Sequence, residues 1–207
     1  MLNSIIGKDI IDFGSGYGGF LMQAKPFTKN ILGIELDVNV KPIYEKNDIP
    51  LVHNLDDTFG IMGGDLLTAF HVVEHLSDPI TTLKQLASLL KPNGKMIVEV
   101  PNADDALLTI YKNKAFSEFT YWSPHLYLYN SYTLKMLAQK AGLKVDFVKC
   151  IQRYPISNTL YWLSNNLSAG HKAWGGFLES TILQEAYESV LASIGATDTI
   201  IAQFRKN

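Results

Sequence analysis

The glycine-rich stretch IDFGSGYGGF, residues 11–20, constrains the fold of this chain more than any other feature. A short apolar run precedes it, four glycines fall within residues 14–19, and a second apolar segment follows. A buried strand, a glycine turn and a helix in that order bring backbone N–H groups close to a ligand, because no Cβ stands in the way. An ordinary tight turn needs far fewer glycines. The stretch therefore predicts an α/β fold with a nucleotide-type ligand site at the end of its first strand.

Two ligand-binding fingerprints overlap in this stretch. The first is the dinucleotide spacing G-x-G-x-x-G, which Gly14, Gly16 and Gly19 satisfy, with the acidic residue Glu35 about twenty positions later. It favours a nicotinamide-dependent oxidoreductase or epimerase. Because the glycines alone fit either fingerprint, this alternative stays open.

The second fingerprint includes the carboxylate that precedes the glycines. Asp12, Gly14, Gly16 and Gly18 form the pattern D-x-G-x-G-x-G, which resembles motif I of class I S-adenosylmethionine-dependent methyltransferases. A carboxylate at the carboxyl end of the first strand attracts the ammonium of the cofactor's methionine part and repels a pyrophosphate. Asp12 therefore favours S-adenosylmethionine as cofactor, with S-adenosylhomocysteine as product.

Two later segments resemble the same family. FHVVEHLSDP (70–79) is similar to the segment after the fourth strand in small-molecule methyltransferases of quinone biosynthesis and sugar modification, and LLKPNGKMIVEVPN (89–102) resembles their fifth strand. The resemblance covers residues 8 to about 150. The Asn/Asp-Pro-Pro-Tyr signature of amino-methyltransferases for nucleic acids or amides is absent here. The resemblance implies a Rossmann-like, seven-stranded, mostly parallel sheet of order 3-2-1-4-5-7-6, with an antiparallel last strand and helices on both faces.

The other expected cofactor contacts follow from that fold. A second strand over 30–37 carries Glu35, whose carboxylate is placed to accept two hydrogen bonds from a ribose diol. A third strand over 49–54 leads into a loop expected beside the adenine, and the segment after the fourth strand lines the pocket with backbone. The predicted cofactor-binding residues are Asp12, Gly14, Ser15, Gly16, Gly18, Glu35, Leu36, Leu55, Asp56 and His71.

Three titratable residues follow the predicted fourth strand (65–72). His71, Glu74 and His75 gather where open α/β sheets bind their ligands. Two histidines and a glutamate can hold a metal, but this spacing does not match the zinc-helix pattern with a distant third ligand. We therefore predict no bound metal.

Two long segments, 103–130 and 151–195, interrupt the expected alternation of strands and helices after strands five and six. Both are rich in aromatic residues, and loops of this length with their own packing are usually functional. We expect them to form an acceptor-side cap within a single domain spanning 1–207. An extra layer of core is the alternative.

The segment SPHLYLYN (123–130) resembles the one that carries an active-site histidine in sugar C-methyltransferases. By that resemblance His125 is the candidate general base, with His75 as second choice. An unperturbed histidine pKa near ~6.5 suits deprotonation of an acceptor at neutral pH. This chain has Ser-Pro before the histidine where the sugar enzymes have acidic residues, so a structural histidine within an aromatic cluster is an open alternative.

Composition narrows the class of protein further. Apolar residues make up 47 % of the 207 residues and charged residues 18 %, which is typical of a globular chain. The formal net charge of −2 lacks the basic footprint of nucleic-acid binding. No segment approaches the ~20 apolar residues of a membrane span, and no signal peptide is recognisable, so we expect a cytoplasmic protein that is a monomer or homodimer.

The sequence thus predicts methyl transfer from S-adenosylmethionine to a small acceptor, at a hydroxyl or carbon of a sugar, nucleotide-sugar or ring metabolite. A nicotinamide-dependent enzyme is one alternative. The other is a non-catalytic, methyltransferase-like partner subunit, because only about seven residues precede the first strand, where many relatives of this fold carry a lid helix.

Overall fold

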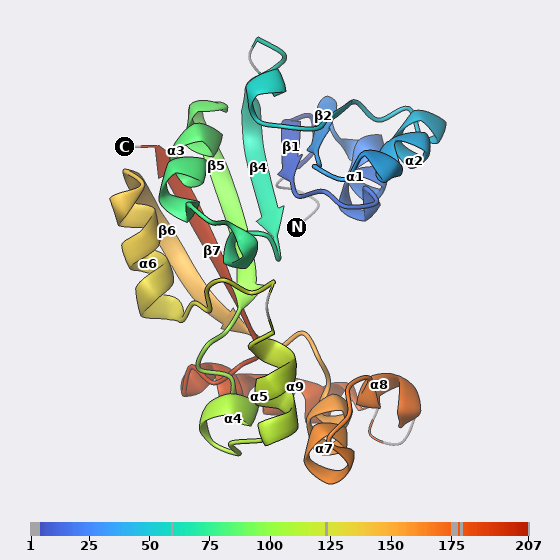
Figure 1. Cartoon of the computed structure of the whole chain (residues 1–207), viewed down its shortest axis with the longest axis vertical. Coiled ribbons are helices and arrows are strands. Elements are labelled where there is room, and N and C mark those ends of the chain that lie inside the picture. Colours follow the sequence, from blue (N-terminus) through green and yellow to red (C-terminus); the bar gives the residue numbers. More distant parts are fainter. Residues whose placement is uncertain (1–4, 59, 123, 175–177, 179, 207) are drawn as a thin grey trace. The chain divides into compact units, whose positions relative to one another are not determined.

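The structure is a computed structural model that describes residues 5–58, 60–122, 124–174, 178 and 180–206 (Figure 1). The chain divides into two compact units. The first comprises Met1–Glu99, Lys135–Phe147 and Ala202–Asn207, and the second comprises Val100–Leu134 and Val148–Ile201. Both predicted insertions, 103–130 and 151–195, have their residues in the second unit.

The strands in the described part of the chain form one seven-stranded sheet of order β3-β2-β1-β4-β5-β7-β6, which confirms the predicted order. Their bounds are β1 Asp9–Phe13, β2 Asn30–Ile34, β3 Leu51–Val52, β4 Gly64–Phe70, β5 Leu90–Pro101, β6 Leu143–Ile151 and β7 Thr199–Lys206.

Strand direction also agrees with the prediction. β1 runs parallel to β2 on one side and to β4 on the other, and all five β1 residues are buried, as expected of a central parallel strand. β7 is antiparallel to β5. The Lys206 ammonium at the end of β7 donates to the Leu90 carbonyl at the start of β5, whereas the Asn102 N–H beyond β5 donates to the Asp198 carbonyl before β7.

In the first unit, short helices and turns follow the strands. They are α1 (Gly19–Ala24), η2 (Lys25–Phe27), η3 (Val38–Val40), α2 (Lys41–Lys46), η4 (Asp56–Thr58), η5 (Val73–His75) and α3 (Pro79–Ser88). The Asp78 side chain caps α3 by accepting from the Thr81 N–H at 3.1 Å, as the sequence predicts. In Figure 1, α1 and α2 lie beside β1 and β2, and a buried cluster that includes Leu21 and Tyr44 joins them to the sheet.

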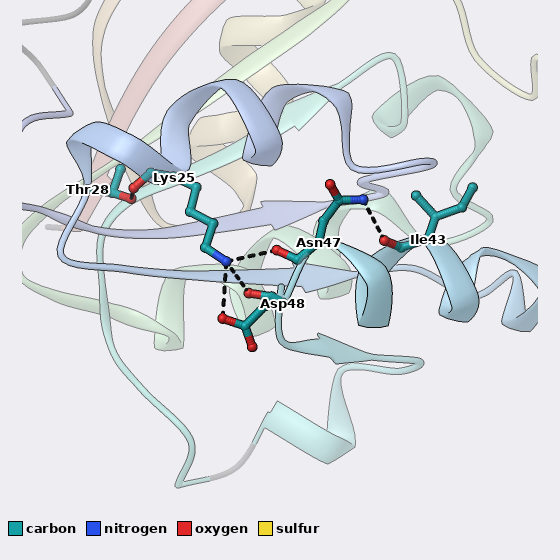
Figure 2. A network of polar contacts seen from close by, with 5 residues as sticks. All are labelled: Lys25, Thr28, Ile43, Asn47 and Asp48. Atoms are coloured by element: carbon teal, nitrogen blue, oxygen red, sulfur yellow. Dashed lines mark hydrogen bonds and ion pairs between the residues drawn. The ribbon is translucent and has the colours of Figure 1, made fainter.

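The end of α2 is held by Lys25, the residue that directly follows α1 (Figure 2). The Lys25 ammonium donates to the Asn47 carbonyl at 2.8 Å and to the Asp48 carbonyl at 2.6 Å, and it pairs with the Asp48 carboxylate at 3.2 Å. Asp48 has φ +50, a left-handed conformation. A cation at this place satisfies carbonyls beyond the last helical turn and favours the negative end of the helix dipole.

The second unit contains α4 (Ala106–Thr109), α5 (Lys114–Thr120), α7 (Ile156–Asn165), α8 (Gly170–Ala173) and α9 (Thr181–Ser193), and α6 (Ser131–Lys140) has residues in both units. Its aromatic residues form a local core. The rings of Phe116 and Phe119 lie 5.2 and 5.4 Å from the ring of Trp162, and the Asn113 amide donates to the Trp162 carbonyl at 3.0 Å. Part of the aromatic content of both insertions is therefore used for packing.

We predict that Lys25→Met lowers the free energy of unfolding by about 1 kcal/mol, because two carbonyls and a carboxylate lose a charged donor that is partly exposed. Urea unfolding followed by circular dichroism measures the difference. Lys84→Met, which removes an exposed lysine from α3, is the matched control and is expected to lie within about 0.5 kcal/mol of the unsubstituted protein. Equal effects of the two substitutions would contradict this role for Lys25.

Candidate functional site

The glycine loop, residues 14–19, is tied to the end of β2. The N–H groups of Gly14 and Ser15 both donate to the Ile34 carbonyl, at 2.8 and 3.2 Å, and the Gly18 N–H closes a turn onto the Ser15 carbonyl at 2.9 Å. Gly14, Gly16 and Gly18 all have positive φ, from +51 to +75°. Since side chains are disfavoured in this region, the sequence spacing D-x-G-x-G-x-G places a glycine at each left-handed residue of the turn.

Gly14 and Gly16 are glycines for different reasons. A Cβ on Gly14 would lie 2.3 Å from a methyl of Val72, so the loop after β4 leaves no room for a side chain there. A Cβ on Gly16 would meet nothing within 4 Å. The protein itself therefore requires the small residue at Gly14, whereas the Gly16 backbone faces open space in which a ligand can approach. This observation fits a cofactor cradled by the loop.

A tyrosine that the sequence analysis missed fixes the middle of the loop. Tyr44 of α2 is almost fully buried, and its hydroxyl lies 2.6 Å from Ser15 Oγ and 3.1 Å from the Gly16 carbonyl oxygen. Burial raises the pKa of the Tyr44 hydroxyl, so it stays a neutral donor. The sequence does place this tyrosine on the apolar face of a helix. Because a buried hydroxyl requires a hydrogen-bond partner, that position could have indicated a contact with the loop.

Glu35, just beyond β2, lies against the same loop. One carboxylate oxygen accepts the Gly16 N–H at 2.8 Å and the other accepts the Asp37 N–H at 3.0 Å. A carboxylate can accept about four hydrogen bonds, so two sites remain for a diol. The next residue, Leu36, is 77 % exposed and presents an apolar side chain beside this carboxylate.

Asp12 occupies the centre of the sheet. It pairs with Gly33 of β2 and Thr68 of β4, and only 4 % of its surface is exposed. Burial raises the pKa of its carboxyl group to about 7, although the Thr68 hydroxyl donates to it at 2.6 Å, and the nearby charge of Glu35 raises the pKa further. A carboxylate held this way has a strong electrostatic preference for a cationic ligand group.

The loop after β4 carries a second polar group of residues. His71 has φ +55, and its ring lies between two carboxylates, with Nε2 3.1 Å from Glu99 and Nδ1 3.5 Å from Glu74. Glu74 is buried, and its nearest oxygen lies 4.0 Å from Nε2 of His75. The structure thus brings His71 and His75 together around one carboxylate.

Leu55 and Asp56, predicted beside the adenine, line a cavity of about 320 Å³. Its other walls are Thr58 and the last part of α3, with no contribution from the glycine loop. The end of α3 is joined to the beginning of β4, since the Leu89 carbonyl accepts the Gly64 N–H at 2.8 Å. The structure therefore places these two residues on a cavity bounded by α3, and their contact with adenine stays a prediction.

His125 belongs to the second unit. Its Nδ1 lies 2.7 Å from the Thr120 carbonyl at the end of α5, and its ring meets the Trp122 ring edge-on at 6.1 Å. Because a carbonyl only accepts, Nδ1 carries the hydrogen, and Nε2 holds the lone pair of the neutral ring. This tautomer suits a base, and the Trp122 contact also agrees with the aromatic cluster that the sequence left as an alternative.

Comparison with known proteins adds the family context. The model of a family described as "Methyltransferase domain" matches residues 5–147. A tRNA U34 carboxymethyltransferase of Syntrophotalea carbinolica is 35 % identical over 103 residues, 45 % of this chain and 32 % of that protein. A ubiquinone biosynthesis O-methyltransferase of Coxiella burnetii is 25 % identical over 180 residues, 81 % of this chain and 76 % of that protein.

Other matches are shorter, and the chain spans only 32–43 % of the length of three of the curated relatives. A solved structure of a SAM-dependent methyltransferase from Archaeoglobus fulgidus shares the fold, with a TM-score of 0.58 and 18 % identity, and the match covers 97 % of this chain and 86 % of that one. Within the part of the chain that the structure describes, the helices are too short or too polar to cross a lipid bilayer.

We predict that Asp12→Asn stabilises the ligand-free protein more at pH 8 than at pH 5 and has little effect near pH 3, below the unfolded pKa. The pKa of Asp12 is about 7 in the folded state and 3.8 when unfolded, so this group contributes stability below pH 4 that is lost as the pH rises to 7. Asparagine keeps the Thr68 hydrogen bond without the charge, and the gain at pH 8 is on the order of 2–4 kcal/mol.

The measurement is urea unfolding of both proteins at several pH values. Because burial also raises the pKa of Asp105 to about 7, the unsubstituted protein alone would mix two titrations. The difference between variant and parent isolates Asp12. A difference that does not change between pH 5 and pH 8 would contradict the assignment.

Proposed function

The chain belongs to the methyltransferase-domain family, whose cofactor is S-adenosylmethionine, and we propose that it transfers the cofactor's methyl group to a small-molecule acceptor. The observation that carries this proposal is the glycine loop. Its backbone is open at Gly16, the Glu35 carboxylate accepts the Gly16 N–H, and the buried Asp12 carboxyl lies near the end of β1, the strand that leads into the loop.

Each part of the cofactor has a complementary group in this proposal. Asp12 and the backbone around Gly14, Ser15, Gly16 and Gly18 hold the methionine part, with its ammonium toward Asp12. Glu35 accepts hydrogen bonds from the ribose hydroxyls through its two remaining sites. Leu36 packs on a face of the adenine. Leu55 and Asp56 border the adenine edge, and the backbone of His71 lines the pocket.

The sulfonium of S-adenosylmethionine supplies an electrophilic methyl group when bound. The work of the chain is to orient that group against the acceptor and to exclude water, and positioning of this kind lowers a barrier by on the order of 7–11 kcal/mol. His125, or His75 as second candidate, takes the acceptor's proton. In the tautomer with the hydrogen on Nδ1, the Nε2 atom of His125 is the ring nitrogen that would take this proton.

A small molecule is the acceptor that the charge of the chain favours. The net charge is −2, whereas nucleic-acid binding usually shows a basic surface. Proteins similar to this chain include a ubiquinone biosynthesis O-methyltransferase, a tRNA U34 carboxymethyltransferase and a ribosomal RNA small subunit methyltransferase, so membership of the family alone does not identify the acceptor. We assign recognition of a sugar, nucleotide-sugar or ring compound to the exposed aromatic side chains of the insertions. These are Tyr111, Phe119, Tyr121, Trp122, Tyr127 and Tyr154.

Calorimetric titration of Gly16→Val tests the cofactor site. A valine side chain would occupy the open space beside the loop, so S-adenosylmethionine and S-adenosylhomocysteine should bind at least about 100-fold more weakly, or not at all. Gly7→Val is the matched control, because Gly7 also has positive φ (+67°) and open surroundings but lies outside the loop. Both substitutions cost similar backbone strain of about 1–2 kcal/mol.

The unsubstituted protein is titrated with both compounds and with NAD. Binding of S-adenosylmethionine that survives in Gly7→Val and is lost in Gly16→Val supports the proposal. Binding of NAD in place of S-adenosylmethionine, or equal affinities in the two variants, would refute it.

A second prediction concerns the ribose. Glu35→Ala should weaken S-adenosylhomocysteine binding by about 1–3 kcal/mol, the usual cost of losing charged hydrogen bonds. Because Glu35 also anchors the Gly16 N–H, affinity alone does not isolate the ribose contact. The 2′-deoxy analogue does: the parent should prefer the natural compound, and Glu35→Ala should bind the two equally. A preference that persists in the variant would place the diol elsewhere.

A further inference from the structure

Tyr44 lies on a short helix, yet its side chain is among the most deeply buried in the chain. The residue is 1 % exposed, and its ring belongs to the buried cluster that joins α1 and α2 to the sheet. Tyr44 belongs to the first unit, as do the glycine loop and Glu35. A buried tyrosine usually finds a partner for its hydroxyl, and here both the ring and the hydroxyl contact groups of the candidate cofactor site.

The ring of Tyr44 requires two neighbouring residues to be glycines. A Cβ on Gly33 of β2 would lie 2.6 Å from the ring carbon Cε1, and a Cβ on Gly18 would lie 3.1 Å from Cζ. By contrast, a Cβ on Gly19, the third glycine of the dinucleotide spacing, would meet none of the described residues within 4 Å. The ring therefore packs against a glycine of the pattern D-x-G-x-G-x-G, whereas the last glycine of G-x-G-x-x-G serves no such contact.

The hydroxyl of Tyr44 holds the open glycine of the loop. Its single hydrogen is shared between Ser15 Oγ at 2.6 Å and the Gly16 carbonyl oxygen at 3.1 Å. On its other side, the Gly16 N–H donates to the Glu35 carboxylate at 2.8 Å. Both polar backbone groups of Gly16 are thus bound by side chains from outside the loop, while its Cα faces open space.

This double restraint matters because glycine has more backbone freedom than any other residue. A ligand that binds one conformation of a loop loses apparent affinity in proportion to the fraction of molecules that populate that conformation. Bonds to Tyr44 and Glu35 raise this fraction before the ligand arrives. Burial raises the pKa of the Tyr44 hydroxyl, so the donor to Gly16 is retained at neutral pH and above.

We propose that Tyr44 is a positioning residue for the cofactor. Its hydroxyl holds the Gly16 carbonyl, which keeps the Gly16 N–H directed at Glu35 and the Glu35 carboxylate oriented toward the ribose hydroxyls. Tyr44 acts through Gly16 and not by touching the cofactor. The inference rests on the proposed cofactor site and adds to it a residue whose part in binding is to fix the loop.

Tyr44→Phe removes the hydroxyl and keeps the ring with its packing, and circular dichroism checks that the fold is retained. Calorimetric titration of the full chain should show S-adenosylhomocysteine bound about 10-fold more weakly, which corresponds to the net strength of one ordinary hydrogen bond.

Amide exchange measured by NMR on the ligand-free protein gives a readout that a merely stabilising tyrosine would not move. In Tyr44→Phe the Gly16 N–H should exchange at least about 10-fold faster, because its bond to Glu35 is no longer held in place. The Gly14 N–H, which donates to the Ile34 carbonyl, is the internal reference and should change little.

Tyr187→Phe is the matched control. Tyr187 lies on α9 in the second unit, its hydroxyl is 2.6 Å from Thr159 Oγ1, and burial raises its pKa to about 12. This variant loses the same kind of bond between two hydroxyls at a place remote in sequence from the loop. It should leave both the cofactor affinity and the exchange of the Gly16 N–H unchanged.

Weaker binding together with faster Gly16 exchange in Tyr44→Phe alone supports the positioning role. If the unsubstituted protein binds S-adenosylhomocysteine and Tyr44→Phe changes neither quantity, or only one of them, the positioning role is overturned while the proposed function stands. Equal losses of affinity in the two tyrosine variants would also overturn it, because the effect would then follow from stability. If the unsubstituted protein binds neither S-adenosylmethionine nor S-adenosylhomocysteine, the proposed function fails and the positioning role fails with it.

Discussion

The buried carboxyl group of Asp12 is the constraint on which the candidate site depends. It lies on the central strand between two parallel neighbours, where the interior disfavours its ionised form and its pKa rises to about 7. Such a group is an electrostatic cost to the empty protein at neutral pH. A ligand that brings a positive charge to it would remove that cost, and this is the basis for our proposal that the cofactor's ammonium lies at the end of β1.

Three contacts, from the loop after β4, from α2 and from the residue after β2, fix the shape of the glycine loop around that position. Val72 packs against Gly14, the Tyr44 hydroxyl meets Ser15, and the Glu35 carboxylate accepts the N–H of the loop's open glycine. The position of Tyr44 depends on α2, whose far end is fixed by Lys25. The loop is therefore preorganised by the packing of the first unit, and the cost of ordering its backbone is met on folding.

The sequence predicted the strand order and the glycine turn because both follow from local patterns. An apolar run, its glycines and the Asp78 cap each act within a few residues. Boundaries were less accurate. The second strand was expected to reach residue 37 but ends at Ile34, and the carboxylate of the next residue, Glu35, accepts the Gly16 N–H of the loop. The third strand was expected over 49–54 but pairs only over Leu51 and Val52.

The interactions that the sequence could not show are those between distant segments. Nothing in the local pattern indicates that Tyr44 meets Ser15 or that Glu74 is buried between two imidazoles. Leu55 and Asp56 were assigned from their place after the third strand, yet the cavity they line has α3 as its other wall. Side-chain direction after a strand depends on turn geometry such as the positive φ of His71, which spacing alone does not fix.

The most direct test of this account is the number of protons released when S-adenosylhomocysteine binds at pH 6, measured by calorimetry in buffers of different ionisation enthalpy. A carboxyl with a pKa of about 7 is mostly protonated at that pH, and an ammonium beside it forces it to ionise. We expect release of roughly 0.5–1 proton per bound molecule, and almost none in Asp12→Asn. No release by the unsubstituted protein, or equal release by both, would contradict the placement of the cofactor's amino-acid end at Asp12.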